Sequence, residues 1–283
     1  MFSIQKLKSL KKVLKLLFSD QEKLRLTLSE YKKQRYLFSN YKEYWANNSL
    51  ELHNRVSRVK EMLQLGTPTG IKFLRLGSMH DGGYVIADDI TPDDYIISFG
   101  IADNVDFEKD LSEFGCAIDM YDYSVDGLPI NVPNSRFFKE KIGIEENCTP
   151  LKTCLNKTDK DVLLKIDIEG SEYDLFSTAT EEELERCRQI TIEFHWLQNL
   201  VYENFYNKAL LSFNNLRKTH TPVLIHPNNN SPFIVLGNSP VPVVFEILYL
   251  RNSTYKFEEE EDLFRGLLKR NNVNYPEIGL TFP

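Results

Sequence analysis

The stretch "LLKIDIEGSEYDLF", Leu163 to Phe176, decides the fold class of this sequence. A mostly apolar run stops at Asp167, and a second acid, Glu169, and then Gly170 follow within three residues. A helix-like pattern begins directly afterwards. A buried strand, a short polar turn and a helix in this order are typical of the βαβ units that build a parallel sheet.

The same alternation of short apolar runs and helical stretches continues on both sides of this stretch. We expect strands at 95–100, 116–124, 136–143, 161–170, 189–197, 222–230 and 241–251. Helices are expected at 105–115, in the stretch that follows Gly170 and ends at Thr178, at 181–187 with Thr180 as the N-cap, and at 204–219. The pattern therefore predicts an α/β domain with a mostly parallel sheet over residues 66–283.

Residues 1–65 differ, because they contain no proline or glycine and are predicted to be helical. Every seventh residue from position 10 is apolar: Leu10, Leu17, Leu24, Tyr31, Phe38 and Trp45. This period favours a coiled-coil seam and a homo-oligomer. Two alternatives stay open, a helical hairpin lying on the catalytic domain and a basic start resting on an anionic membrane surface.

A break in this helical region is expected near residues 47–49. The second helix should bury one face, made of Leu52, Val56, Val59 and Leu63. The sequence "GTPTG" at 66–70 is then interpreted as a linker between the helical region and the α/β domain.

Composition narrows the class of protein further. A formal net charge of −7 argues against nucleic acid as a partner. The four cysteines form no CxxC pair, which is typical of thiols in a reducing compartment. No signal peptide is recognisable and no apolar run reaches the ~18 residues of a membrane span. We therefore expect a cytoplasmic protein, with the lysine-rich start as a contact to the inner face of the membrane.

The residues at the ends of the predicted strands gather at one edge of the sheet, where open α/β sheets bind ligands, and many of them are polar. They are Ser98, Phe99 and Gly100, then Asp122 and Tyr123, then Ile142, then Asp167 and Glu169, then Glu193 and His195, and last His226. The first of these loops lacks both GxGxxG and a GKS/T motif, so a phosphate cradle is not expected. Asp122 ends the next strand, where a carboxylate can accept both hydroxyls of a ribose.

Several blocks together resemble the FkbM-like methyltransferases. They are "GSMHDGGYV", "YIISFGIADNVDFEKDL", "MYDYS", "LLKIDIEGSEYDLF", "ITIEFHWL", "LIHPNN" and "VPVVFEILYL", which span roughly residues 70–251. The resemblance implies a Rossmann-like class I methyltransferase sheet with an N-terminal α-helical extension, and S-adenosylmethionine as the cofactor.

The resemblance also implies roles for individual residues. Gly100 lets the chain pass the methionine half of the cofactor, Asp122 binds the ribose and Ile142 flanks the adenine. Asp81, Gly82 and Gly83 close the site from the N-terminal side. Ser98, Phe99, Tyr123 and Asp167 complete the expected cofactor contacts.

Methyl transfer to a hydroxyl requires a base or a metal ion, because a sugar hydroxyl is a poor nucleophile near neutral pH. His195 and His226 are the candidate bases, and Asp167 is expected to face the transferred methyl group. Asp167, Glu169, Glu193 and His195 also suit a divalent cation such as Mg²⁺ or Mn²⁺. Alternatively, Glu169 caps the following helix, where a carboxylate favours the helix dipole.

These expectations combine into an O-methyltransferase that uses S-adenosylmethionine and acts on a sugar hydroxyl of a surface polysaccharide or its lipid-linked precursor. Two alternatives remain. The acceptor is instead a protein or a small molecule, or the chain is an inactive coiled-coil scaffold that carries a methyltransferase-like domain.

Overall fold

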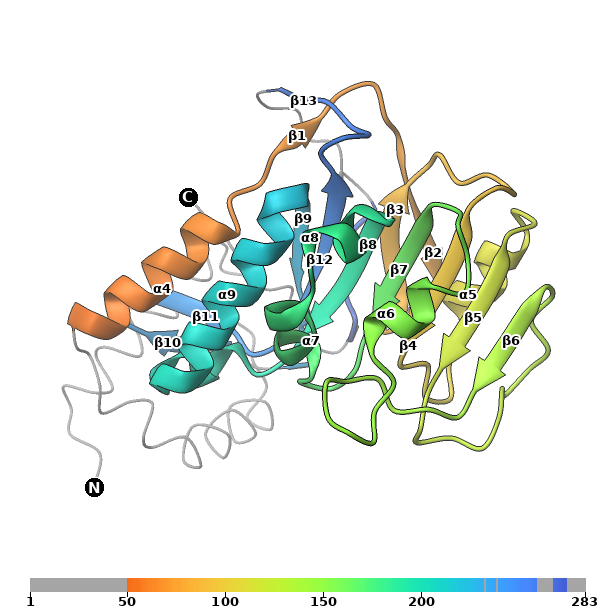
Figure 1. The fold of residues 1–283 in the computed structure, drawn as a ribbon. Helices are drawn as coiled ribbons and strands as arrows, with labels where there is room; N and C mark the ends of the chain where they lie inside the picture. Colours follow the sequence, from red (N-terminus) through yellow and green to blue (C-terminus); the bar gives the residue numbers. More distant parts are fainter. Residues whose placement is uncertain (1–49, 232, 238, 259–266, 274–283) are drawn as a thin grey trace.

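The computed structural model describes residues 50–231, 233–237, 239–258 and 267–273 (Figure 1). The predicted heptad seam at residues 10–45 and the lysine-rich start lie outside the described residues. The seam and the membrane contact therefore stay predictions.

A seven-stranded sheet forms the centre of the described structure. Its strands are β4 (Tyr95–Phe99), β5 (Ala117–Tyr121), β6 (Ser135–Phe138), β7 (Val162–Ile166), β8 (Cys187–Phe194), β9 (His220–Pro227) and β12 (Phe245–Arg251). The order is β6-β5-β4-β7-β8-β12-β9. The first five strands run parallel, whereas β12 is antiparallel to both β8 and β9. The chain leaves β4 toward β5 and later returns to the other side of β4 as β7, so β4 and β7 flank a topological switch point.

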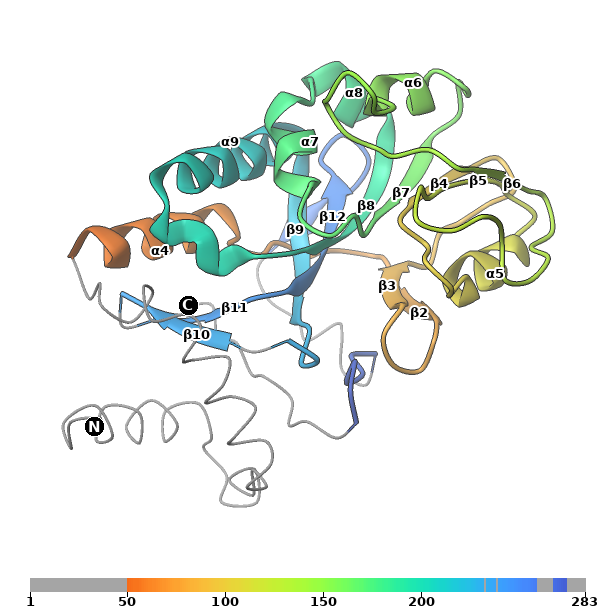
Figure 2. The same cartoon turned by 90° about the horizontal axis from the view of Figure 1, so that it is seen from below.

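Helices cover one face of the sheet, and a hairpin with one helix covers the other (Figure 2). The first face carries α6 (Leu151–Leu155), α7 (Glu172–Thr178), α8 (Glu181–Glu185) and α9 (Glu203–Thr219). The 3₁₀ helix η2 (Leu197–Val201) links β8 to α9. The second face carries α5 (Asp106–Ser112) and the antiparallel pair β2 (Phe73–Gly77) and β3 (Gly83–Ala87). Both faces of the sheet are buried, which explains why its strands read as nearly continuous apolar runs.

The predicted α/β class and its seven strands are confirmed. The strand predicted at 241–251 is partly wrong, because β11 (Ser239–Pro242) forms a separate hairpin with β10 (Phe233–Leu236) before β12 begins. The predicted linker is also more ordered than expected, since β1 (Thr67–Pro68) pairs with β13 (Phe257–Glu258). The sequence prediction missed the β2–β3 hairpin and α6. Each of these strands and this helix has only five residues, so their sequence signal is weak.

The second helix of the N-terminal region is confirmed as α4 (Leu50–Met62), which packs against α9. Its predicted face is buried, and the side chains of Leu52, Val56, Val59 and Leu63 belong to the same core as the sheet. The predicted division into residues 1–65 and 66–283 therefore separates α4 from residues that it contacts, and this division stays a prediction.

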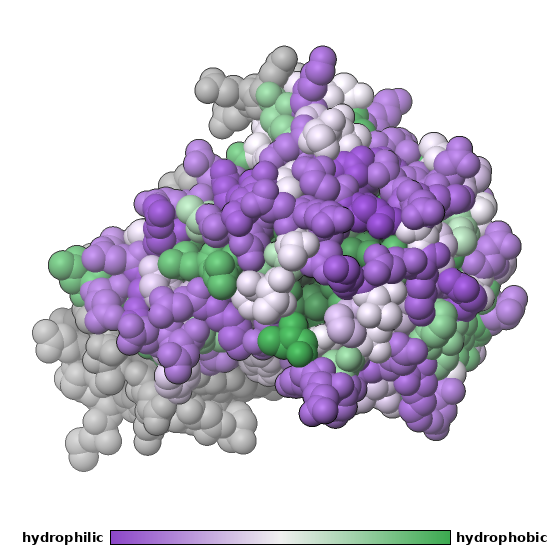
Figure 3. All heavy atoms as spheres, in the orientation of Figure 1, coloured by the Kyte–Doolittle hydropathy of each residue, from purple (hydrophilic) through white to green (hydrophobic). Residues whose placement is uncertain are grey.

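The exterior visible in Figure 3 is mostly hydrophilic, with small separate hydrophobic areas. Among the described residues, no helix has both the length and the apolar character needed to cross a membrane.

We predict that Leu63→Ala lowers the free energy of unfolding by about 2–5 kcal/mol, because it leaves a cavity in the core that α4 shares with the sheet. Leu50→Ala, at the other end of α4, is the matched control, since Leu50 is 76% exposed. Its effect should stay within about 0.5 kcal/mol. Urea unfolding followed by circular dichroism measures both. Equal stabilities of the two variants would show that α4 does not contribute to the core.

Candidate active site

The turn between β7 and α7 begins the candidate site. Asp167 directly follows β7, and its backbone N–H donates to the carbonyl of Phe99 at the end of β4. Glu169 and Gly170 both have positive φ angles, 55° and 107°, which lets the chain reverse into α7. The stretch "DIEGSE" therefore brings Asp167 to the switch point between β4 and β7.

Gly100 makes this arrangement possible. Its φ is +74°, and a Cβ atom built on it would lie 1.6 Å from the backbone oxygen of Asp167. No side chain fits in that space, so the single glycine after β4 is required for the contact between the two loops. Gly100 therefore packs against the turn between β7 and α7.

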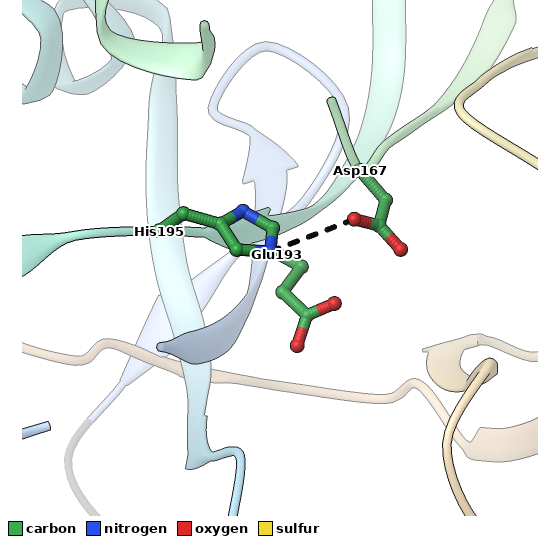
Figure 4. A group of neighbouring side chains, drawn as sticks. All are labelled: Asp167, Glu193 and His195. Atoms are coloured by element: carbon green, nitrogen blue, oxygen red, sulfur yellow. Dashed lines mark ion pairs between the residues drawn. The ribbon is translucent and has the colours of Figure 1, made fainter. Parts of the chain in front are cut away.

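Asp167, Glu193 and His195 converge at this edge (Figure 4). One potential ligand atom from each lies within 4.8 Å of those of the other two. The Nε2 atom of His195 is 3.8 Å from Oδ1 of Asp167. Glu193 and His195 are two positions apart at the end of β8, so their side chains leave the strand on the same side. The structure thus brings together three of the four predicted metal ligands.

The fourth predicted ligand, Glu169, lies outside this group. Its Oε2 atom is 3.5 Å from Nε2 of His195, but its side chain is 77% exposed. The alternative that Glu169 caps α7 is wrong, because the N-cap is Ser171, and Glu172 instead accepts hydrogen bonds from the N–H groups of the turn.

The electrostatics of this group favour a bound cation. Burial raises the pKa of Glu193 well above its ordinary value, and the charges of Asp167 and Glu246 raise it further. Burial alone would lower the pKa of His195, but the hydrogen bond and charge of Glu172, with the charges of Glu193 and Asp167, raise it to about 9. A proton or a metal ion is therefore stabilised between these side chains.

Two further groups touch Asp167. The hydroxyl of Tyr84, on β3, donates to Oδ2 of Asp167 at 3.0 Å. The Nζ atom of Lys165 lies 3.9 Å from the same oxygen and donates a hydrogen bond to the carbonyl of Gly100. Tyr84 and Lys165 thereby fix the carboxylate while its side chain stays 25% exposed.

The predicted base His226 lies farther along the same edge. Glu246 on β12 is in register with Glu193 on one side and with His226 on the other. His226 is therefore two strands, or about 10 Å, from Glu193. Its Nδ1 atom is 3.3 Å from Oε2 of Glu246. The two candidate bases are thus separated, and only His195 belongs to the group around Asp167.

Asp81 closes the rim of this edge. The side-chain amide of Asn228 donates to both Glu193 and Asp81, at 2.5 and 3.3 Å. The amide of Asn271 donates to both Glu246 and Asp81, at 2.6 and 3.4 Å. Asp81, predicted to close the cofactor site, is therefore connected to β8 and β12 through two asparagines.

The neighbouring Gly82 and Gly83 lie at the start of β3. Gly82 has a φ of +80° and lies against the side chain of Asn104, and a Cβ atom on Gly83 would collide with Arg75. Both glycines are therefore needed for packing of the hairpin, whatever their part in binding the cofactor.

Asp122 directly follows β5, and its carboxylate accepts hydrogen bonds from other residues of the chain. Its Oδ2 accepts from the N–H groups of Ile101 and Ala102, and its Oδ1 accepts from the N–H and hydroxyl of Ser124. Burial would raise the pKa of this carboxyl, but these four hydrogen bonds outweigh burial and hold the pKa below its usual range. Asp122 fixes the loop after β4, and a ribose would have to replace the hydroxyl of Ser124 or share Asp122 with it.

The remaining predicted cofactor residues differ in exposure. Tyr123 is exposed and Ile142 is buried. The side chains of Ser98 and Phe99 point into the interior, where Ser98 donates to Glu108 and Phe99 packs on Tyr121. For these two residues, only the backbone is available to a ligand.

Sequence reasoning missed five polar side chains of the site: Tyr84, Lys165, Glu172, Glu246 and Asn271. Four of them lie inside motifs that had been recognised: Tyr84 in "DGGYV", Lys165 and Glu172 in "LLKIDIEGSEYDLF", and Glu246 in "VPVVFEILYL". Their presence in those motifs was the available signal. Asn271 carries no local signal, because only the folded chain brings it to β12.

A sheet of this order, with a ligand edge at the β4–β7 switch point, is the Rossmann-like fold of S-adenosylmethionine-dependent methyltransferases. The family described as "Methyltransferase FkbM domain" matches residues 86–221. This match supports an S-adenosylmethionine-dependent methyltransferase of the FkbM family.

Comparison with solved structures found a TehB-like SAM-dependent methyltransferase from Corynebacterium glutamicum ATCC 13032. The TM-score is 0.31 and the identity 13%, over 58% of this chain and 83% of that chain. Comparison with curated protein sequences found no match.

We predict that Gly100→Ala abolishes binding of S-adenosylhomocysteine, because the added methyl group forces the β4 and β7 loops apart. Gly127→Ala is the matched control, since no atom lies within 4 Å of the Cβ position of Gly127. Isothermal titration calorimetry on both variants measures the effect. Wild-type affinity in Gly100→Ala would show that the two loops do not need their close contact.

Proposed function

We propose that this methyltransferase transfers a methyl group to a hydroxyl of a sugar, in a surface polysaccharide or its lipid-linked precursor, with the help of a divalent ion. The observation that carries the proposal is the convergence of Asp167, Glu193 and His195 at the switch-point edge. Carboxylates and one imidazole are ligands that suit Mg²⁺ or Mn²⁺.

The residues at this edge fit S-adenosylmethionine in charge. The cofactor carries a sulfonium and an ammonium group, and acidic side chains surround the end of β7. The backbone after Gly100, together with Asp122 and Tyr123, would hold the cofactor, with Asp81 at the rim. When bound, S-adenosylmethionine supplies an electrophilic methyl group, and the protein contributes alignment.

Activation of the hydroxyl is the chemical task left to the side chains. A divalent ion held by Asp167, Glu193 and His195 would lower the pKa of a hydroxyl bound to it. Without an ion, Nε2 of His195 would take the proton itself. We favour the ion, because Nε2 faces the carboxylates of Asp167 and Glu169 at 3.8 and 3.5 Å. His226 is two strands away, so we assign it to acceptor binding.

The aromatic side chain next to His195 supports a sugar acceptor. Trp196 is 40% exposed and has a φ of +63°, which is unusual for a large residue. A Cβ atom on Gly170 would lie 2.6 Å from its indole ring, so that glycine leaves room for the ring to lie against the turn. An exposed indole face beside a hydroxyl-activating group suits stacking against the C–H face of a sugar ring.

We predict that methyl transfer is lost in chelator and returns with Mg²⁺ or Mn²⁺. The assay measures transfer of labelled methyl groups from S-adenosylmethionine into polysaccharide and lipid-linked glycan extracts. His195→Ala should lower the rate by about 10²–10⁴-fold while the affinity for S-adenosylhomocysteine stays the same. His53→Ala is the matched control, because His53 is exposed on α4 and its ring is hydrogen-bonded to the carbonyl of Gly237, away from the site.

Other outcomes would contradict parts of this proposal. Full activity after exhaustive chelation would remove the ion and leave His195 as the base. Label that enters protein or small molecules would exclude the glycan acceptor. Cofactor binding without transfer to any acceptor fraction would favour the inactive scaffold.

A further inference from the structure

Glu172, the first residue of α7, carries a carboxylate that is fully buried. Its Oε1 atom accepts three hydrogen bonds: from the N–H of Ile168 at 3.2 Å, from the N–H of Gly170 at 3.1 Å and from Nδ1 of His195 at 3.0 Å. One oxygen thus joins the turn after β7 to the histidine after β8.

The negative charge of Glu172 is not needed for the turn. The oxygen of a glutamine amide would accept the same two backbone hydrogen bonds without a charge. The second oxygen, Oε2, is buried and has no hydrogen-bond partner in the described part of the chain. Burying an ionised carboxylate in this way is costly unless a positive group compensates for it. Among the three donors on Oε1, only His195 can supply a positive charge.

The hydrogen bond to Glu172 also determines which nitrogen of His195 is available. An ionised carboxylate only accepts hydrogen bonds, so Nδ1 carries a proton. In the neutral ring, Nε2 then carries the lone pair, and it faces Asp167 at 3.8 Å and Glu169 at 3.5 Å. A lone pair directed at carboxylates is repulsive unless a proton or a metal ion lies between them, and a metal ion can take the place of that proton. This orientation suits a metal ion.

We propose that Glu172 is a positioning residue that holds His195 with Nε2 directed at a divalent ion shared with Asp167 and Glu193. The inference rests on the ion in the proposed function and adds the residue that prepares its nitrogen ligand. A carboxylate behind a metal-binding imidazole fixes the tautomer and the ring orientation and makes the nitrogen a stronger ligand.

The test measures Mn²⁺ affinity by electron paramagnetic resonance of the free ion, in the full chain, for wild type, Glu172→Gln and Glu108→Gln. Glu108 is the matched control, because it is equally buried, accepts a hydrogen bond from Ser98 and lies on the other face of the sheet. We expect about 10–100-fold weaker Mn²⁺ binding in Glu172→Gln and unchanged binding in Glu108→Gln. Affinity for S-adenosylhomocysteine, measured on the same samples, should stay the same in Glu172→Gln.

Each result separates the inference from the proposed function. Tight Mn²⁺ binding in wild type with no loss in Glu172→Gln would overturn the inference alone. No Mn²⁺ binding in wild type would overturn the ion and the inference together, while methyl transfer could still proceed through His195 as a base. Equal losses in both variants would show a general effect of removing a buried charge and would overturn the positioning role.

A second measurement needs no change at Glu172. Long-range ¹H–¹⁵N spectra of the histidine rings, with His195 assigned through His195→Gln, are recorded with and without Zn²⁺ as a diamagnetic probe. We expect Nδ1 to carry the proton in both states and the Nε2 resonance to shift when Zn²⁺ binds. A shift at Nδ1 instead, or at neither nitrogen, would overturn the inference.

Discussion

Concentrated negative charge at one edge of the sheet is the constraint on which the site depends. Asp167 directly after β7, Glu193 on β8 and Glu246 on β12 form one row across three neighbouring strands, and Glu193 and Glu246 are buried. Like charges in a buried setting raise each other's pKa, so the row is stable only if protons or cations neutralise it. Asn228 and Asn271 stabilise the carboxylates through hydrogen bonds but bring no charge. A divalent ion and a cationic cofactor would both meet this need.

The topology of the sheet produces this row. The parallel strands β7 and β8 present the residues after their ends at the same edge, and β12 enters between β8 and β9 in the opposite direction. At the β4–β7 switch point two loops pack closely, because the missing side chain of Gly100 lets it lie against Asp167. The order of the strands therefore determines both where the site lies and which acidic residues gather there.

How well the sequence predicts this site depends on whether each interaction joins residues that are close together or far apart in the sequence. Alternation along one strand predicts that Glu193 and His195 share a side, and the end of an apolar run identifies Asp167. These are local signals. The contact of Glu172 with His195 and the insertion of β12 beside β8 depend on strand order, which no local pattern encodes. For the same reason, the hydrogen bonds that Asp122 accepts from Ile101, Ala102 and Ser124 could not be predicted. A carboxylate at a strand end has the same sequence signal whether it faces a ligand or groups of its own chain.

The most direct measurement is X-ray diffraction from crystals grown with Mn²⁺ and S-adenosylhomocysteine, with anomalous data collected at the manganese edge. The account predicts an anomalous peak about 2 Å from a carboxylate oxygen of Asp167, a carboxylate oxygen of Glu193 and Nε2 of His195. It also predicts the cofactor product over the loop after β4, with its sulfur facing that peak. A peak at another place, or cofactor density with no peak between these three side chains, would contradict the account.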